Sequence, residues 1–197
     1  MPLLRISVDG VPVAAIPTVG REIVGARIGG SHDDPDYADL SAWGGTYVRG
    51  DSVDHRAWVD QRVLVVGQTV EIELLPSGME LGTGVLMGPQ GADTPPPGYS
   101  HEEEVRKLAA ELRQLPRVRE KYELRYQSSK TEGIYFETLP DEYGFGLNVL
   151  WNDLYPERAS VSLYAYTLEA MEQQGTTRDP VRERLDVGQK CRLAFVA

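Results

Sequence analysis

Residues 63–75 read VLVVGQTVEIELL, and residues 184–196 read RLDVGQKCRLAFV. Each stretch carries Val-Gly-Gln and then a segment in which apolar and polar residues alternate, which is the pattern of a β-strand with one buried face. The alternating apolar residues are Val70, Ile72 and Leu74 in the first copy, and Cys191, Leu193 and Phe195 in the second. The second copy follows the first by 121 residues, from residue 63 to residue 184, which predicts a β repeat.

Other parts of the two halves match as well. At the same spacing Pro35 matches Pro156, Ala38 matches Ala159, Ser41 matches Ser162 and Thr46 matches Thr167. A spacing of 123 places 11–17 on 134–140. Both halves are predicted to have the same order of elements: a hairpin, a strand, an acidic loop with proline, another strand, a polar stretch, the Val-Gly-Gln turn and a closing strand. The alternative is two unrelated β stretches that share turn chemistry.

Glycine and proline dominate residues 78–99, which predicts a linker between the halves. Ser100 and Glu103 form a capping-box pattern, and an apolar stripe at helical spacing runs from Val105 to Leu115, so a helix is expected to follow. Pro116 should end or kink that helix.

The predicted fold is mainly β (α+β), with two similar halves in a sandwich or a barrel, joined by the linker and one amphipathic helix. The predicted segments are an N-terminal repeat at 1–77, a linker at 78–99, a helix at 100–121 and a C-terminal repeat at 122–197.

The composition indicates which kinds of partner and which cellular location to expect. The formal net charge is −10 over 197 residues, which disfavours nucleic acid and anionic membrane surfaces and favours a basic protein partner. The single cysteine, Cys191, excludes an internal disulfide and is expected to be a buried small residue. With no apolar run long enough to span a bilayer, we expect a cytoplasmic protein; the oligomeric state stays open.

Residues 40–75 resemble a β module of small uncharacterised bacterial proteins. In that module a strand ending in two glycines precedes a loop, a tryptophan and a Val-Gly-Asp turn before a final strand. The matching residues are Gly44-Gly45, Trp58 and 66–68, with Gln68 in place of the usual acidic residue. The resemblance implies a β module and no particular chemistry.

Catalytic and metal-binding motifs are not found in the sequence. His32, His55 and His101 lack the spacing of zinc ligands, and no Gly-x-Ser-x-Gly or phosphate-binding loop occurs. We therefore expect no enzyme activity, no metal and no cofactor, although paired carboxylates for glycoside hydrolysis need no local motif and stay open.

The candidate partner-binding residues lie in and around two acidic loops at equivalent places of the repeat. In the first half the loop is rich in aspartate, and it could be solvated, bind calcium or face a partner; the calcium register is missing. In the second half, aromatic residues accompany the acidic ones, as is common at interfaces. The candidates are Asp33, Asp34, Asp36, Asp39, Trp151, Asp153, Tyr155 and Glu157.

These observations favour a protein-binding function, most concretely a bacterial immunity protein or antitoxin that neutralises a basic toxin. The alternative is a carbohydrate- or small-ligand-binding β module with Trp43, Trp58 or Trp151 as a stacking platform, which requires an exposed indole. An enzyme without a local motif and a homo-oligomeric structural protein are further alternatives.

Overall fold

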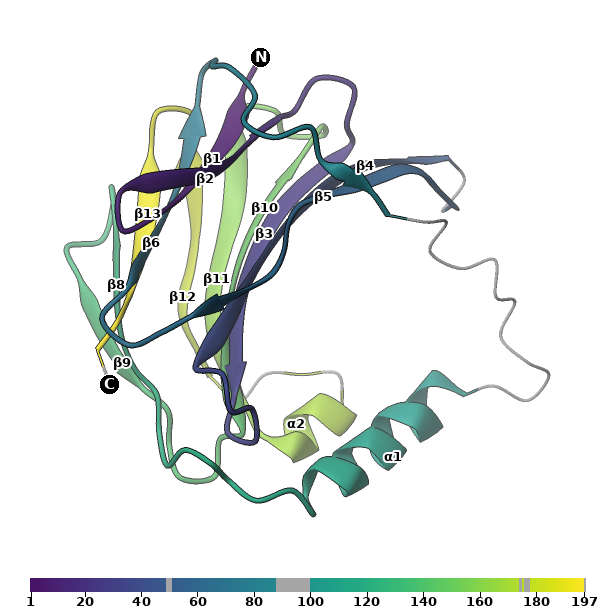
Figure 1. The fold of residues 1–197 in the computed structure, drawn as a ribbon, viewed down its shortest axis with the longest axis vertical. Helices are drawn as coiled ribbons and strands as arrows, with labels where there is room; N and C mark the ends of the chain where they lie inside the picture. The colour runs from purple at the N-terminus through teal and green to yellow at the C-terminus, as the bar shows by residue number, and fades with distance from the viewer. Residues whose placement is uncertain (49–50, 88–99, 174, 176–177, 197) are drawn as a thin grey trace.

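The chain folds into two antiparallel β-sheets that pack face to face (Figure 1). The computed structural model describes residues 1–48, 51–87, 100–173, 175 and 178–196. Strands account for 55% of the structure and helices for 10%, which confirms the predicted mainly β, α+β fold. The arrangement of the sheets is that of a sandwich.

The sandwich consists of a six-stranded sheet A and a seven-stranded sheet B. Sheet A has the order β2 (Val11–Pro17), β1 (Leu3–Val8), β6 (Thr69–Leu75), β13 (Lys190–Phe195), β8 (Glu123–Ser128), β9 (Ile134–Glu137). Sheet B has the order β12 (Arg178–Asp186), β11 (Arg158–Tyr166), β10 (Gly144–Asn152), β3 (Ile23–Ser31), β4 (Ala38–Val48), β5 (Asp51–Leu64), β7 (Val85–Leu86). The two helices are α1 (His101–Leu112) and α2 (Leu168–Glu172).

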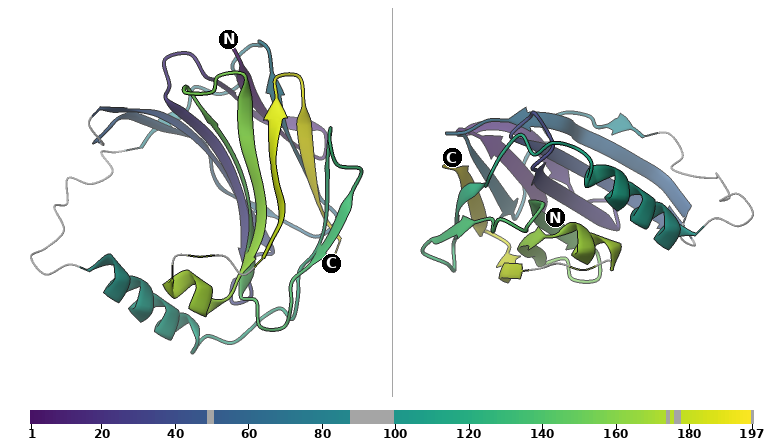
Figure 2. Two further views of the ribbon diagram at one scale, coloured as in Figure 1. Left: turned by 180° about the vertical axis from the view of Figure 1, so that it is seen from behind. Right: turned by 90° about the horizontal axis from the view of Figure 1, so that it is seen from below.

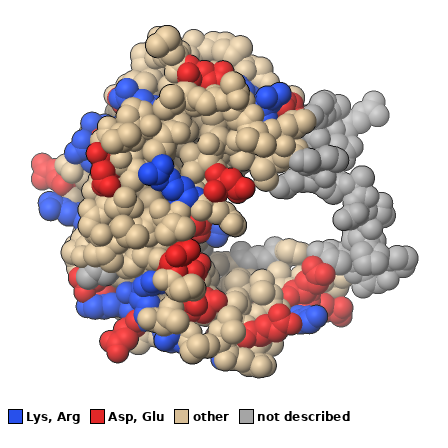
Figure 3. Space-filling view, viewed as in Figure 1, with Lys and Arg blue, Asp and Glu red and all other residues tan. Residues whose placement is uncertain are grey.

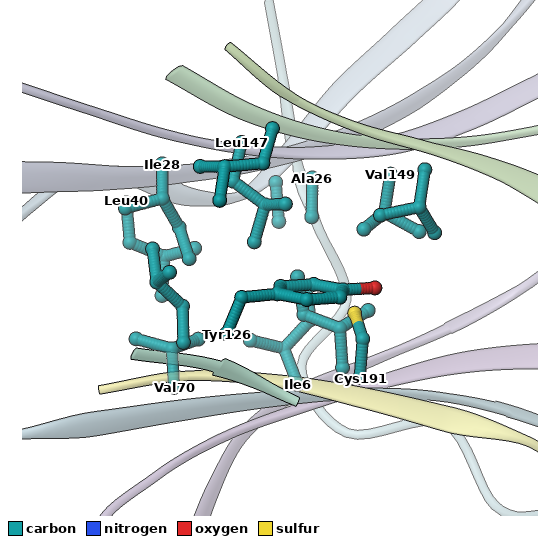
Figure 4. Packing of buried hydrophobic residues seen from close by; sticks show 14 of the residues in the cluster. Ile6, Ala26, Ile28, Leu40, Val70, Tyr126, Leu147, Val149 and Cys191 are labelled. Carbon is teal, nitrogen blue, oxygen red and sulfur yellow. The ribbon is translucent and has the colours of Figure 1, made fainter. Parts of the chain in front are cut away.

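Period-two alternation places one face of each sheet in a shared core. In β13, Leu193 is completely buried while its neighbour Arg192 is exposed, as the apolar alternation predicts. The close view in Figure 4 shows the side chains that sheet A and sheet B direct toward one another. They include Ile6, Val70, Tyr126 and Cys191 from sheet A and Ala26, Ile28, Leu40, Leu147 and Val149 from sheet B.

The strand order has an internal two-fold symmetry. Exchanging β1, β2 and β6 with β8, β9 and β13 reproduces the order of sheet A, and exchanging β3, β4 and β5 with β10, β11 and β12 reproduces sheet B apart from β7. Each half contributes three of these strands to each sheet. Residues 1–77 and 122–197 are therefore interleaved, and neither half has a sheet of its own.

The two Val-Gly-Gln turns join the halves reciprocally. Gly67 and Gly188 both have a φ of +90°, a conformation that favours glycine. The Gly67 amide donates to the Phe195 carbonyl at 2.9 Å, and the Gly188 amide donates to the Leu74 carbonyl at 2.6 Å. Each turn is thus hydrogen-bonded to the closing strand of the other half.

The glutamine of each turn has a defined role. The Gln68 side-chain oxygen accepts from the Val65 amide at 3.1 Å, and that of Gln189 accepts from the Asp186 amide at 2.9 Å. Each glutamine therefore closes its own turn through the same side-chain-to-backbone hydrogen bond.

The pairing registers define which residues are equivalent. Gly25 pairs with Trp43, and 121 residues later Gly146 pairs with Tyr164. In the hairpins, Leu4 pairs with Ile16 as Leu124 pairs with Phe136, which is a spacing of 120. The spacing of 123 expected for the second hairpin strand is therefore wrong, because strand pairing and not the shared proline sets the register.

Helix α1 begins as predicted and ends early. The Ser100 hydroxyl accepts from the Glu103 amide, and the helix stops at Leu112, before Pro116, so 113–121 is not helical. Among the helix residues only Ala109 is buried; α1 packs on α2 and stands away from the sheets (Figure 2). No helix in the described parts of the chain is long and apolar enough to cross a bilayer.

The predicted linker is partly structured. Within 78–87, β7 pairs with β5, and Leu81 forms a bridge to Ala15 of β2. This segment therefore spans one side of the sandwich from sheet A to sheet B. Residues 88–99 lie outside the described residues.

Candidate functional site

The two predicted acidic loops lie at opposite ends of sheet B. In the β3–β10 pair, Ser31 faces Gly144 and Ile23 faces Asn152. The loop with Asp33, Asp34 and Asp36 follows Ser31, and the loop with Asp153, Tyr155 and Glu157 follows Asn152. A nine-residue strand separates them by about 26 Å, so the structure does not bring them into one site.

Trp151 is part of the core, so its predicted role as a partner-binding residue is wrong. It is 3% exposed, because it lies on the inward-facing side of β10 with Phe145, Leu147 and Val149. Its indole donates to the Pro156 carbonyl at 3.0 Å. No ring surface is left for a ligand or a partner.

Trp58 is also a poor platform, because its ring already packs against other parts of the chain. The Arg21 guanidinium lies 4.6 Å from the ring centroid, and Gly84 packs directly against the indole. The indole nitrogen donates to the Gly82 carbonyl at 3.0 Å. Trp43 remains as the candidate stacking residue.

The outer face of sheet B has a glycine floor on its two central strands. In β3, Gly25 and Gly29 alternate with core residues, and in β10, Gly144 and Gly146 do the same. Their missing side chains leave room directly above the backbone. This face is concave and turned toward α1 (Figure 1), and the space-filling view shows a recess between them (Figure 3).

Planar side chains from the neighbouring strands lie on this floor. A methyl group on Gly25 would come within 2.9 Å of the Trp43 ring, so the indole lies directly on the glycine. By the same criterion the Tyr164 ring lies on Gly146 and the Tyr166 ring lies on Gly144. We call this surface the aromatic face; it consists of Trp43, Tyr164 and Tyr166 with the polar residues Arg27, Asp39 and Asn148.

The polar residues stand between the rings. Arg27 and Asn148 pair across the central strands, and Asn148 donates to the Tyr164 hydroxyl at 3.5 Å. Burial raises the pKa of Asp39; the charge of Asp34 acts in the same direction, while Arg27 opposes the rise. Asp39 is the one predicted partner-binding residue that the aromatic face includes.

Tyr166 stays neutral at physiological pH. Burial raises the pKa of Tyr166 to about 12, although the nearby charge of Arg27 opposes the rise. Tyr164 and Tyr166 lie with ring centroids 6.4 Å apart. Phenol rings beside a guanidinium and an amide give a surface of flat rings with hydrogen-bond donors and acceptors between them.

Other reactive residues serve structural roles. His32 is completely buried, and its Nδ1 lies 2.6 Å from the Arg119 carbonyl oxygen; burial lowers its pKa. Burial also raises the pKa of the Cys191 thiol to about 12. Among the described residues, no group of three or more histidine, cysteine or acidic side chains could hold a metal ion.

Sequence reasoning missed most of the aromatic face, although a signal was present. Gly25 and Gly29, and Gly144 and Gly146, are an even number of residues apart, in strands whose alternate residues Val24, Ala26 and Ile28, and Phe145 and Leu147, are apolar. Such a strand buries one face and has few side chains on the other, so that neighbouring rings or a ligand can approach the backbone closely. Comparisons with known protein families, curated proteins and solved structures found no match for this chain.

Proposed function

We propose that this chain is a non-catalytic binding protein and that the aromatic face recognises an extended carbohydrate. The observation that carries the proposal is the placement of Trp43 and Tyr164, whose rings lie on glycines of the central strands and on the concave side of sheet B. The glycine floor holds each ring against the sheet, so little ordering is needed on binding.

The chemistry of a sugar matches this surface. A pyranose ring presents an apolar face of C–H groups and a rim of hydroxyls. Aromatic rings cover the apolar face, while Arg27 and Asn148 supply donors and acceptors for the rim. The net charge of −10 makes nucleic acid, the other common partner of flat rings, a poor match.

The test is binding to a panel of oligosaccharides by the full chain and by two variants. Trp43→Ala removes one platform, and Tyr135→Ala removes an exposed ring of sheet A that lies outside the aromatic face. We expect binding by the wild type and by the Tyr135 variant, and at least a tenfold loss for the Trp43 variant. Failure of every glycan to bind, or full binding by the Trp43 variant, would exclude the proposal.

A basic protein partner is the second candidate, as for an immunity protein or antitoxin. The supporting observation is the loop after β3, where Asp34 and Asp36 are exposed on an acidic protein. Such charges accelerate association with a cationic partner and make it salt-dependent. The test is capture of a basic protein from a bacterial lysate that is abolished by high salt and by the double variant Asp34→Asn, Asp36→Asn.

A further inference from the structure

We infer that the aromatic face contains two symmetry-related subsites that one linear glycan occupies together, in either chain direction. This inference rests on the proposed carbohydrate-binding function and adds the length and the orientation of the ligand. It follows from the position of the internal two-fold axis.

The two-fold axis passes through the centre of the aromatic face. Arg27 pairs with Asn148 across β3 and β10, and these two residues are themselves 121 positions apart, so the symmetry exchanges them. The same operation exchanges Gly25 with Gly146 and Trp43 with Tyr164. Each side of the axis therefore has one ring on one glycine, with a polar residue at the centre.

The pairing register fixes the spacing of the subsites. Gly25 lies opposite Leu150, and Gly146 lies four residues before Leu150 on β10. Four residues along a strand and one strand spacing across it separate the two glycines by about 14 Å. A monosaccharide is too small to contact both rings, whereas an extended oligosaccharide spans them.

The two subsites are similar and differ at their edges. Leu150 flanks the Trp43 ring: its side chain and the indole both lie close to the position of a Gly25 methyl group. The Tyr164 ring has Tyr166 as its neighbour. Both subsites thus present flat apolar surface, which suits sugars with equatorial substituents, such as β-1,4-linked glucose or N-acetylglucosamine polymers.

The symmetry also predicts how the chain of sugars is oriented. A glycan has a reducing and a non-reducing end, and rotation about the axis reverses that direction while leaving the two ring platforms in equivalent places. A linear ligand consequently finds the same two contacts in both directions. The symmetry-equivalent positions carry different residues, Trp43 opposite Tyr164 and Arg27 opposite Asn148. The two orientations of the ligand therefore differ in affinity, and both remain possible.

The experiment measures affinity against ligand length with two matched series, glucose to cellohexaose and N-acetylglucosamine to chitohexaose. For the wild type we expect the hexasaccharide of at least one series to bind about 100-fold more tightly than its monosaccharide, because the second contact is intramolecular. Trp43→Ala and Tyr164→Ala should each remove most of this gain, while Tyr135→Ala should retain it.

Orientation is read from a hexasaccharide that carries a spin label at its reducing end. We expect broadening of amide resonances at both Ile23 and Gly144, which the two-fold axis exchanges and which lie about 27 Å apart at opposite ends of the paired strands. Broadening at only one of them overturns the bidirectional arrangement. Equal affinity for monosaccharide and hexasaccharide, or loss of the gain in only one of the two ring variants, overturns the paired subsites while leaving carbohydrate binding intact. Absence of binding by every sugar removes the proposed function and this inference with it.

Discussion

Replacing Gly25 by alanine should displace the Trp43 ring, and replacing Gly29 by alanine should not. Both glycines lie on β3 and face the same side of sheet B. A methyl group at 25 would lie 2.9 Å from Trp43 Cζ2, whereas one at 29 would have Arg27 Nε at 3.6 Å as its nearest neighbour. Carbon atoms pack at about 3.5–4.0 Å, so the indole must retreat by roughly 0.6–1 Å in the first variant only.

The two substitutions share their effect on the unfolded chain. Each removes backbone freedom, which stabilises by about 0.4–1 kcal/mol where the native conformation allows a side chain. Gly25→Ala also loses the packing of the indole on the sheet, and overpacking of this kind typically costs about 1–3 kcal/mol. We expect it to be less stable than Gly29→Ala by about 1–2 kcal/mol, or roughly 2–8 °C in Tm.

Chemical and thermal denaturation followed by circular dichroism measure the difference, and tryptophan fluorescence of the folded state reports the altered surroundings of Trp43. Equal stability of the two variants with an unchanged emission spectrum would refute the placement of the indole on Gly25. In that case the flat platform, and the binding proposal that depends on it, would lose its structural basis.

The remaining predictions concern the core and the contacts between the sheets. Arg178→Ala leaves the buried Glu142 carboxylate without its ion pair and should cost about 2–3 kcal/mol, less than for a fully buried pair because the Arg178 side chain is 36% exposed. Burial alone would raise the pKa of Glu142, but hydrogen bonds from Arg178 and from a backbone amide lower it below the ordinary value of 4.5. The stabilisation by the Glu142–Arg178 ion pair is therefore complete above pH 4.5 and declines as the pH falls further. In urea titrations, the free energies of unfolding of the wild type and of Arg178→Ala should therefore become similar at low pH. Gln189→Ala removes the hydrogen bond to the Asp186 amide and should cost about 0.5–1.5 kcal/mol by chemical denaturation; an unchanged midpoint would contradict that role. Leu193→Ala should cost about 2–5 kcal/mol in the same assay, and a cost near zero would contradict its burial. The Cys191 thiol, buried and with a pKa of about 12, should react with a thiol reagent at neutral pH only after unfolding, which labelling with and without denaturant would show.

Local patterns in the sequence predict the elements of this fold well. The two Val-Gly-Gln turns, the alternation around Leu193 and the capping serine of α1 all appear where the sequence places them, because each depends on neighbours a few residues away. The same reasoning was available for Trp151, which continues the apolar alternation of Phe145, Leu147 and Val149 and is buried with them.

Pairing between distant strands is what the sequence left open. The separation of the two acidic loops depends on β3 and β10 lying antiparallel in register, and no local pattern specifies that contact. The aromatic face depends on it too, since its glycines and rings come from four strands of both halves. Residues that work together across a sheet become visible only once the order of strands is known.

The reciprocal Val-Gly-Gln turns bear on the history of the chain. Two subunits of a symmetric homodimer make such contacts, in which each subunit closes the other through an identical patch. A polypeptide of one repeat would have to find its partner by diffusion, whereas here the covalent connection makes the same encounter intramolecular and independent of concentration. Fusion has a second consequence. A homodimer must carry the same residue on both sides of its axis, but a fused pair is free to place tryptophan at 43 and tyrosine at 164, and arginine at 27 and asparagine at 148.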